Sequence, residues 1–97
     1  MALNYSDRET LRPILLPRIR QAIDKFFMYV LGGGGAPGQT RIDFCKNNLA
    51  NIATLAETCS HYVMSETEFI DGGTSISDAA ISTRVEYVLQ NFLGMPA

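Results

Sequence analysis

A glycine-rich segment, Gly32 to Thr40, holds the residues closest to a chemical motif in this sequence. Its spacing meets the phosphate-binding pattern G-x-x-x-x-G-K-[ST] at Gly33, Gly38 and Thr40, and an apolar run precedes it as a strand would. The lysine of that pattern is replaced by Gln39, whose neutral amide offers hydrogen bonds but no positive charge to a triphosphate. We therefore expect nucleotide affinity at this segment to be feeble.

The length of the chain also argues against a phosphate-binding loop. Domains with that loop are multi-stranded parallel sheets whose crossovers each need about 30 residues or more, and this chain has 97 residues in total. No second apolar strand ending in aspartate follows to hold magnesium. The segment is interpreted as a flexible connector between helices, with a degenerate nucleotide-binding module as a remaining alternative.

Two cysteines and one histidine are the other candidates for chemistry. Cys45 and Cys59 fall in one predicted helix, about 21 Å apart at 1.5 Å per residue, too far for a disulfide, so we expect buried thiols. Cys59 and His61 point to different faces of that helix, which excludes a contacting nucleophile and base. One histidine and two cysteines cannot complete a four-ligand zinc site. We expect no enzyme activity, cofactor, metal or small-molecule substrate.

Charged side chains gather in two segments that are candidates for contacts with other molecules. Glu66, Glu68 and Asp71 lack the spacing of a calcium loop and are interpreted as a solvated acidic turn. The N-terminal region is basic, which raises the question of nucleic acid, and its cations are Arg8, Arg12, Arg18, Arg20 and Lys25. Nearby acidic residues dilute this charge and the isoelectric point is about 5.2, so nucleic acid is not the expected partner.

The net charge of −2 hides an asymmetry between the two halves of the chain. Residues 1–46 carry seven basic and four acidic side chains, a balance of +3, whereas residues 47–97 carry one basic and six acidic, a balance of −5. Such segregation can arise by chance in a small protein. It also favours attraction between unlike faces of neighbouring copies, in head-to-tail rings or arrays.

Composition and length predict one helical domain over residues 1–97. The chain is 46% hydrophobic and 19% charged, as in a soluble globular protein, and has neither a membrane-length apolar run nor a secretion signal. A domain of this size buries about 60–65% of its unfolded surface, so its stability margin is small and association with a partner would stabilise it.

The glycine loop Gly33, Gly34 and Gly35 is the candidate adaptable contact with a neighbouring subunit, because a loop without side chains can change its conformation easily.

The elements that would hold these residues follow a helical period. We predict an all-α fold, a small bundle of three main helices at about 13–31, 40–64 and 76–93, with a short N-terminal helical piece and Gly-rich loops. Ser6 and Glu9 form a capping box for the first piece, and Pro13 and Pro17 are expected to separate it from the helix that follows.

Buried stripes and caps are predicted for each main helix. Thr40 with Asp43 is expected to cap the 40–64 helix, which is taken as the central one, and Ser75 or Ser77 opens the last. Gly94 and Pro96 end it. The expected core positions repeat three and four apart, and they are Ile19, Ala22, Ile23, Phe26, Phe27, Val30 and Leu31; Ile42, Cys45, Leu49, Ile52, Ala53, Ala56, Cys59 and Val63; and Ile81, Val85, Val88, Leu89 and Phe92.

Two segments resemble small all-helical structural proteins of tailed bacteriophages, mainly over residues 41–94. In residues 74–94 an S-D-x-x-I pattern opens the helix at Ser77 and an N-F pair ends it at Phe92, while Arg41 leads a helix over 41–51 as in those proteins. The chain differs from them in having no tryptophan. The resemblance implies a virion component rather than an enzyme.

Together these features predict a non-enzymatic structural component of a tailed-phage virion, at the neck or connector, the tail or the capsid surface. It is expected to act by self-association and by packing against other virion structural proteins, as a homo-oligomer assembled in the host cytoplasm. The alternative is a cytosolic helical regulatory or adaptor protein that binds a protein or nucleic acid through Arg8 to Lys25.

Overall fold

The described part of the chain is helical. The computed structural model describes residues 5–63 and 75–97, with side chains from residue 9 onward, and forms no strand in these ranges. Its elements, in chain order, are α1 (Tyr5–Leu31), α2 (Gln39–Asn48), the 3-10 turn η1 (Leu49–Asn51), α3 (Ile52–Val63) and α5 (Asp78–Asn91). The predicted all-α bundle is confirmed.

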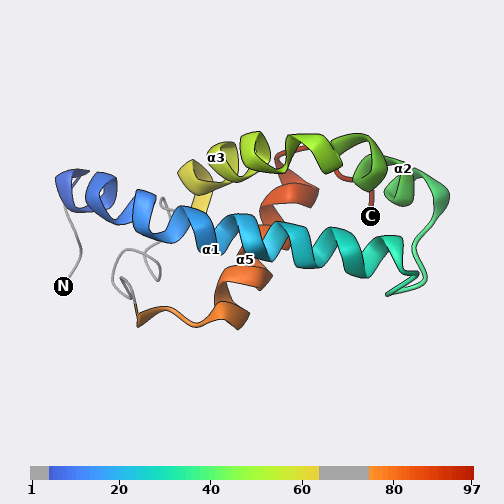
Figure 1. Ribbon diagram of the computed structural model, residues 1–97, viewed down its shortest axis with the longest axis horizontal. Coiled ribbons are helices and arrows are strands. Elements are labelled where there is room, and N and C mark those ends of the chain that lie inside the picture. Colours follow the sequence, from blue (N-terminus) through green and yellow to red (C-terminus); the bar gives the residue numbers. More distant parts are fainter. Residues whose placement is uncertain (1–4, 64–74) are drawn as a thin grey trace.

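Helix α1 is the long element on which the other helices pack (Figure 1). Its 27 residues span about 40 Å at 1.5 Å per residue, close to the 43 Å long dimension of the molecule. Helix α3 runs beside α1, and α5 crosses behind α1 in this view and contacts both (Figure 1). The central helix is therefore α1, and the prediction that residues 40–64 take that place was wrong.

The core lies where α1, α3 and α5 face one another. Its buried side chains come from the apolar stripes of the helices and from the C-terminal tail: Leu11, Leu15, Ile19, Ala22, Ile23, Phe26, Phe27, Val30, Cys45, Ile52, Ala56, Cys59, Val63, Ile81, Val85, Val88, Leu89 and Met95. Three predicted core residues are exposed instead: Leu49, Ala53 and Phe92. Phe92 leaves the stripe because α5 ends at Asn91 and the next backbone angles, φ −125° and ψ −24°, are not helical.

Helix α1 is continuous through both of its prolines, so the predicted break near Pro13 or Pro17 was wrong. Both prolines are exposed, four residues apart, and the missing amide donors therefore lie on the solvent side. On the opposite side Leu11, Leu15 and Ile19 are buried, and that burial stabilises the helix across the proline sites. The helix also begins at Tyr5, so Ser6 lies inside it rather than capping it.

The predicted helix over 40–64 is interrupted by η1, between α2 and α3. The side-chain amide of Asn48 donates a hydrogen bond to the backbone carbonyl of Phe44 at 2.8 Å, and the backbone of Asn48 adopts φ −110° and ψ 7°. Asparagine competes in this way with the helical ladder, and two more asparagines, Asn47 and Asn51, lower the local helix propensity further. The irregular backbone at Asn48 and η1 interrupts the helical period, and Leu49 and Ala53 lie off the buried stripe.

Of the later caps, the one predicted for the 40–64 helix was wrong and the two predicted for the last helix are confirmed. Gly38, not Thr40, precedes α2 and makes no side-chain cap, while Gln39 donates to the carboxylate of Asp43 at 2.8 Å. Ser77 caps α5 as predicted, because its hydroxyl accepts a hydrogen bond from the amide of Ala80 at 3.1 Å. Gly94 turns the chain with a φ of +83°, which brings Met95 into the core.

Candidate functional site

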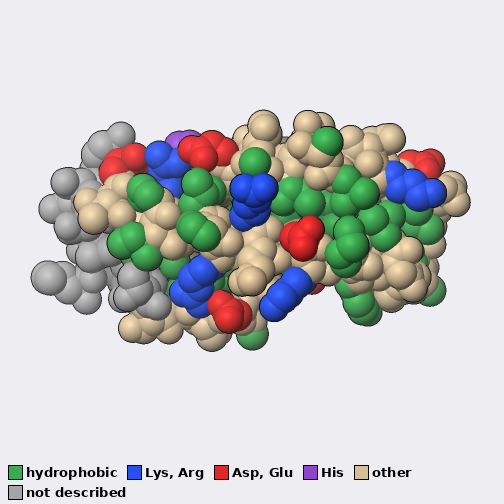
Figure 2. Space-filling model, in the orientation of Figure 1, with side chains coloured by type: hydrophobic (Ala, Val, Ile, Leu, Met, Phe, Trp, Pro, Cys, Tyr) green, Lys and Arg blue, Asp and Glu red, His purple; other side chains and the backbone are tan. Residues whose placement is uncertain are grey.

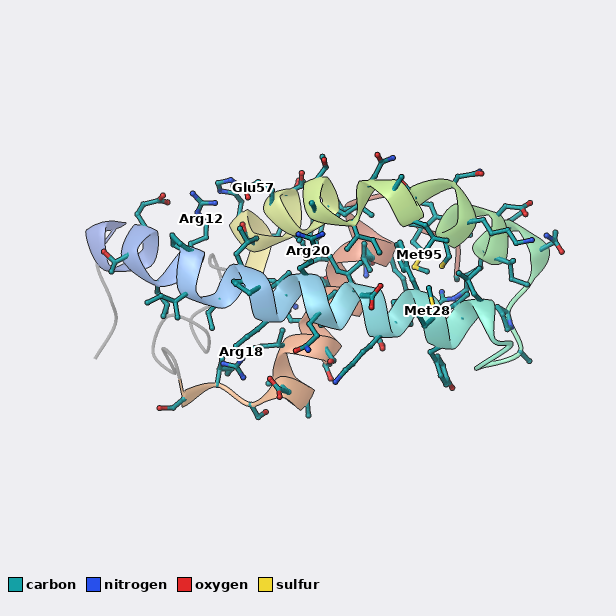
Figure 3. All side chains as sticks on the ribbon, viewed as in Figure 1. Arg12, Arg18, Arg20, Met28, Glu57 and Met95 are labelled. Carbon is teal, nitrogen blue, oxygen red and sulfur yellow. The ribbon has the colours of Figure 1, made fainter. Side chains whose placement is uncertain are left out.

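Two of the predicted contact arginines form ion pairs within the chain. Arg12 lies toward Glu57 of α3 (Figure 3), with 2.9 Å between Nη1 and Oε1, and also contacts Glu9 at 3.4 Å. The hydrogen bond to Glu57 raises the pKa of Arg12. Arg18 donates through Nη2 to Oδ1 of Asp78 and to the carbonyl of Ile76, both at 2.7 Å. These two ion pairs connect α1 to α3 and to the start of α5.

The pairing of Asp78 with Arg18 makes part of the stability depend on pH. The hydrogen bond from Arg18 lowers the pKa of Asp78 below its ordinary value, so its contribution is complete above the unfolded pKa of about 3.9. The contribution is lost as pH falls through the lower folded pKa. We expect Asp78→Asn to destabilise the protein at pH 7 more than at pH 2, measured by urea unfolding at both pH values.

A charge-matched variant separates this effect from the change in net charge. Asp24→Asn removes one exposed carboxylate for which the described residues provide no ion pair. An Asp78→Asn penalty that stays the same from pH 7 to pH 2 would contradict the role assigned to the Arg18 pair.

The remaining predicted cations do not form a basic patch on the face shown in Figure 2. Arg20 and Lys25 are exposed, but red and blue side chains alternate there among hydrophobic and other groups (Figure 2). Arg20 stands at the front of α1 beside α3 (Figure 3), over an open depression of about 460 Å³ that Asp24 also lines. Arg8 belongs to α1, but its side chain lies outside the described residues, as do Glu66, Glu68 and Asp71.

The glycine loop ends α1 in a Schellman motif. The amide of Gly34 donates to the carbonyl of Tyr29 at 2.8 Å, and that of Gly33 donates to Val30 at 3.0 Å. Gly33 has a φ of +89° and Gly35 one of +75°, in the left-handed region that glycine favours. Gly34 lies under the ring of Tyr29, where a side chain would collide. The segment before the loop is helical, so the strand of a phosphate-binding loop is missing.

Gly33 is expected to contribute to the free energy of unfolding through its backbone conformation alone. A Cβ at this position would meet no atom within 4 Å, so the cost of Gly33→Ala comes from φ. We expect a loss of about 1–2 kcal/mol in the free energy of unfolding, measured by urea denaturation. Gly38→Ser is the matched control, because Gly38 is equally open but has a φ of −73°, which suits a helix cap. Equal losses in both variants would contradict this explanation.

The cysteines are unsuited to nucleophilic chemistry. Cys45 and Cys59 are free and buried, as predicted, and burial raises the pKa of both thiols, that of Cys59 to about 12. Both therefore stay protonated at neutral pH. His61 is exposed in the last turn of α3. Over residues 5–63 and 75–97 no three or more His, Cys, Asp or Glu side chains are grouped to hold a metal ion.

An exposed aromatic cluster, Tyr62, Tyr87 and Phe92, is the feature that sequence reasoning missed. The rings of Tyr62 and Phe92 stack with centroids 4.7 Å apart and planes 15° from parallel, and Tyr87 meets Phe92 edge-on at 6.0 Å. The three side chains are 38%, 45% and 51% exposed. Arg84 lies over the ring of Tyr87, with its guanidinium carbon 4.4 Å from the centroid.

The sequence held one signal for this cluster. Tyr87 lies between the core positions Val85 and Val88, so an aromatic ring there is off the buried stripe and must face outward. Tyr62 belongs to α3 and Phe92 follows α5, and only the packing of these helices brings them together. The cluster places ring faces, tyrosine hydroxyls and a guanidinium on one surface.

A second exposed surface, the Tyr29 face, lies between α1, α2 and α5. It is an open depression of about 490 Å³ whose lining includes Lys25, Phe26, Tyr29, Arg41 and Glu86. Arg41 lies over the ring of Phe26 at 5.2 Å and donates to the carbonyl of Pro96 at 2.9 Å, which holds the C-terminal tail on α2. Tyr29 is 59% exposed, the highest value among the exposed large hydrophobic residues described.

Comparisons with known proteins assign no family to this arrangement. No protein-family model, curated protein or solved structure matches the chain. Within the described ranges 5–63 and 75–97, every helix is too short or too polar to cross a bilayer.

Proposed function

We propose that this protein is a non-enzymatic structural component of a tailed-phage virion, which acts by packing against copies of itself and against other virion proteins. The observation that carries the proposal is the aromatic cluster Tyr62, Tyr87 and Phe92, because contiguous exposed rings on a small chain are typical of protein–protein interfaces. The phage context comes from the resemblance of residues 41–94 to virion proteins.

The charge distribution and the arginine pairs support packing over nucleic-acid binding. Arg12 and Arg18, two of the five cations in the basic N-terminal region, are held by carboxylates of α3 and α5. A surface that reads or coats nucleic acid needs clustered cations that face the phosphates. The alternative is a regulator that binds through Arg8 to Lys25. Two of the positive charges in that region are already paired within the chain, so fewer are available to a partner than the sequence suggests.

Purified particles provide the direct test. In a phage whose genome encodes this chain, we expect quantitative mass spectrometry of density-banded virions to find it at a fixed ratio to the major capsid protein. The ratio should survive a wash in about 1 M salt, which screens charge but not apolar packing. A chain recovered only from the host lysate, and absent from banded particles, would contradict the proposal.

A further inference from the structure

Among the described α-helices, α2 buries the fewest residues. One of its ten residues is buried, Cys45, whereas α3 buries five and α5 buries four. A helix of this length is marginal on its own, because about 12–15 residues are needed even in favourable sequences. Contacts with the rest of the chain must therefore hold α2 in place, and segments with little buried surface are the first to open.

Residues 94–97, which we call the latch, supply one of those contacts. Gly94 turns the chain, and the amide of Met95 donates to the carbonyl of Leu89 on α5 at 3.0 Å. The side chain of Met95 is 3% exposed within the core. The carbonyl of Pro96 accepts from Nη1 of Arg41 on α2 at 2.9 Å, and the C-terminal end lies beside α2 (Figure 1). The latch is thus fixed on α5 and contacts α2.

Arg41 is placed for the latch rather than for its own helix. It is the third residue of α2, where a cation meets the positive end of the helix dipole, an unfavourable position. Its guanidinium is held instead by the carbonyl of Pro96 and by the ring of Phe26 on α1, whose centroid is 5.2 Å from the guanidinium carbon. One side chain therefore joins α1, α2 and the latch.

Both ends of α2 are suited to act as hinges. The loop before it contains Gly33 and Gly35, which have left-handed φ, and Asn48 at its end leads into η1 with non-helical backbone angles. Loop residues and the last residues of an element absorb the backbone changes of hinge motions. Helix α2 can therefore move while α1, α3 and α5 keep their packing.

The surface that α2 covers is apolar. The ring of Phe44 meets that of Phe27 on α1, and the thiol of Cys45 is fully buried. Motion of α2 away from α1 uncovers both Phe27 and Cys45. Cys59 is also fully buried, but it lies on α3, which packs on α1 and α5, so it stays covered unless the core unfolds.

We infer that the latch is a strap that controls the local opening of α2. While Met95 is seated in the core and Pro96 bonds to Arg41, α2 is closed on α1. When the latch lifts, α2 opens on its two hinges and the core of α1, α3 and α5 persists. The strap does not depend on what the chain packs against, so it and the proposed virion role stand or fall separately.

Alkylation of the two cysteines in the full chain measures this opening. Iodoacetamide reaches Cys45 when α2 opens but Cys59 only when the core unfolds, and peptide mass spectrometry distinguishes the two sites. Each rate is divided by that of the same cysteine in the urea-unfolded chain. When labelling is slower than reclosing, the corrected rate reports the open population. In the wild type we expect the corrected rate of Cys45 to exceed that of Cys59.

Variants of the latch should raise the rate at Cys45. We expect Met95→Ala to raise it about thirtyfold, the factor implied by the lower end of the usual cost of truncating a buried methionine. Cys59 should accelerate by the same factor, because the latch is also lost when the whole domain unfolds. Arg41→Gln removes the bond to Pro96 and should raise the rate at Cys45 about tenfold.

The direction of the Arg41→Gln effect separates opening from a change in thiol chemistry. Burial raises the pKa of Cys45 and the charge of Arg41 opposes that rise, so loss of the charge alone would slow alkylation. Arg41→Gln also tests the same contact if circular dichroism shows that Met95→Ala does not fold. Arg20→Gln, which removes an exposed guanidinium from α1, is its control and should leave both rates unchanged.

Leu15→Ala tests whether α2 opens separately from the core. Leu15 is fully buried in the first half of α1, away from the end that leads to α2, and its packing persists when only α2 opens. We expect Leu15→Ala to raise the rate at Cys59 about thirtyfold, with no change at Cys45.

Two results would overturn the inference. If neither Met95→Ala nor Arg41→Gln accelerates alkylation of Cys45, the latch does not hold α2 closed. If Leu15→Ala accelerates Cys45 as much as Cys59, α2 opens only when the whole domain unfolds.

Discussion

Replacing Phe27 by alanine is expected to remove a large part of the conformational stability of this protein. Phe27 is fully buried on α1, and its ring meets that of Phe44 on α2 edge-on at 6.2 Å between centroids. Truncating a buried phenylalanine costs about 3–5 kcal/mol, through lost burial and the cavity left behind. A domain of this size has about 5–15 kcal/mol in total.

Thermal unfolding followed by far-ultraviolet circular dichroism measures this loss. We expect the midpoint to fall by roughly 15–30 °C, given about 4–8 °C per kcal/mol for a domain of this length. Tyr29→Ala, two residues along the same helix but 59% exposed, is the control and should shift the midpoint little. Both proteins must be compared at one concentration where they are monomeric, because association adds stability by mass action. Equal shifts would contradict the assigned core.

The sequence predicts best those segments in which the buried residues recur at one regular helical spacing. The stripe from Ile19 to Val30 repeats every three or four residues, and each of its members is buried. Ser77 and Gly94 were also predictable, because a helix cap and a left-handed turn depend on the chemistry of one residue. Such features are local, so tertiary contacts do not need to be known.

What sequence could not predict depends on contacts between distant residues. Arg12 pairs with Glu57, 45 positions away, and Arg18 with Asp78, 60 positions away. In the sequence these arginines look like a free basic region, and only the packing of α1 against α3 and α5 shows that they are paired. The aromatic cluster was missed for a related reason, since Tyr62 and Phe92 meet across two helices.

Errors of helix length arose where a local signal competed with burial. Asn48 interrupts the helix although Cys45 and Ile52 are buried within one turn of it, because its side-chain amide bonds to the carbonyl of Phe44 and Asn47 and Asn51 lower the helix propensity around it. The prolines do not interrupt α1, because Leu11, Leu15 and Ile19 are buried on the opposite side of the helix.

Replacing Pro17 by alanine is expected to stabilise the protein by about 3 kcal/mol. In a helix interior proline is about 3 kcal/mol less favourable than alanine, a difference that already includes the greater freedom of alanine in the unfolded chain. Pro17 is exposed within α1, so the replacement forms a backbone bond to residue 13 without opening a cavity.

Pro37→Ala is the control for this stabilisation. Pro37 lies in the loop before α2, where its ring restricts the backbone without interrupting a helix. It should lower the free energy of unfolding by about 0.4–1 kcal/mol, through the greater freedom of the unfolded chain. Opposite signs at Pro17 and Pro37, measured by urea denaturation, would follow directly from an unbroken α1. A loss of stability in both variants would contradict an unbroken α1 and favour a break at its prolines, as the sequence alone predicted.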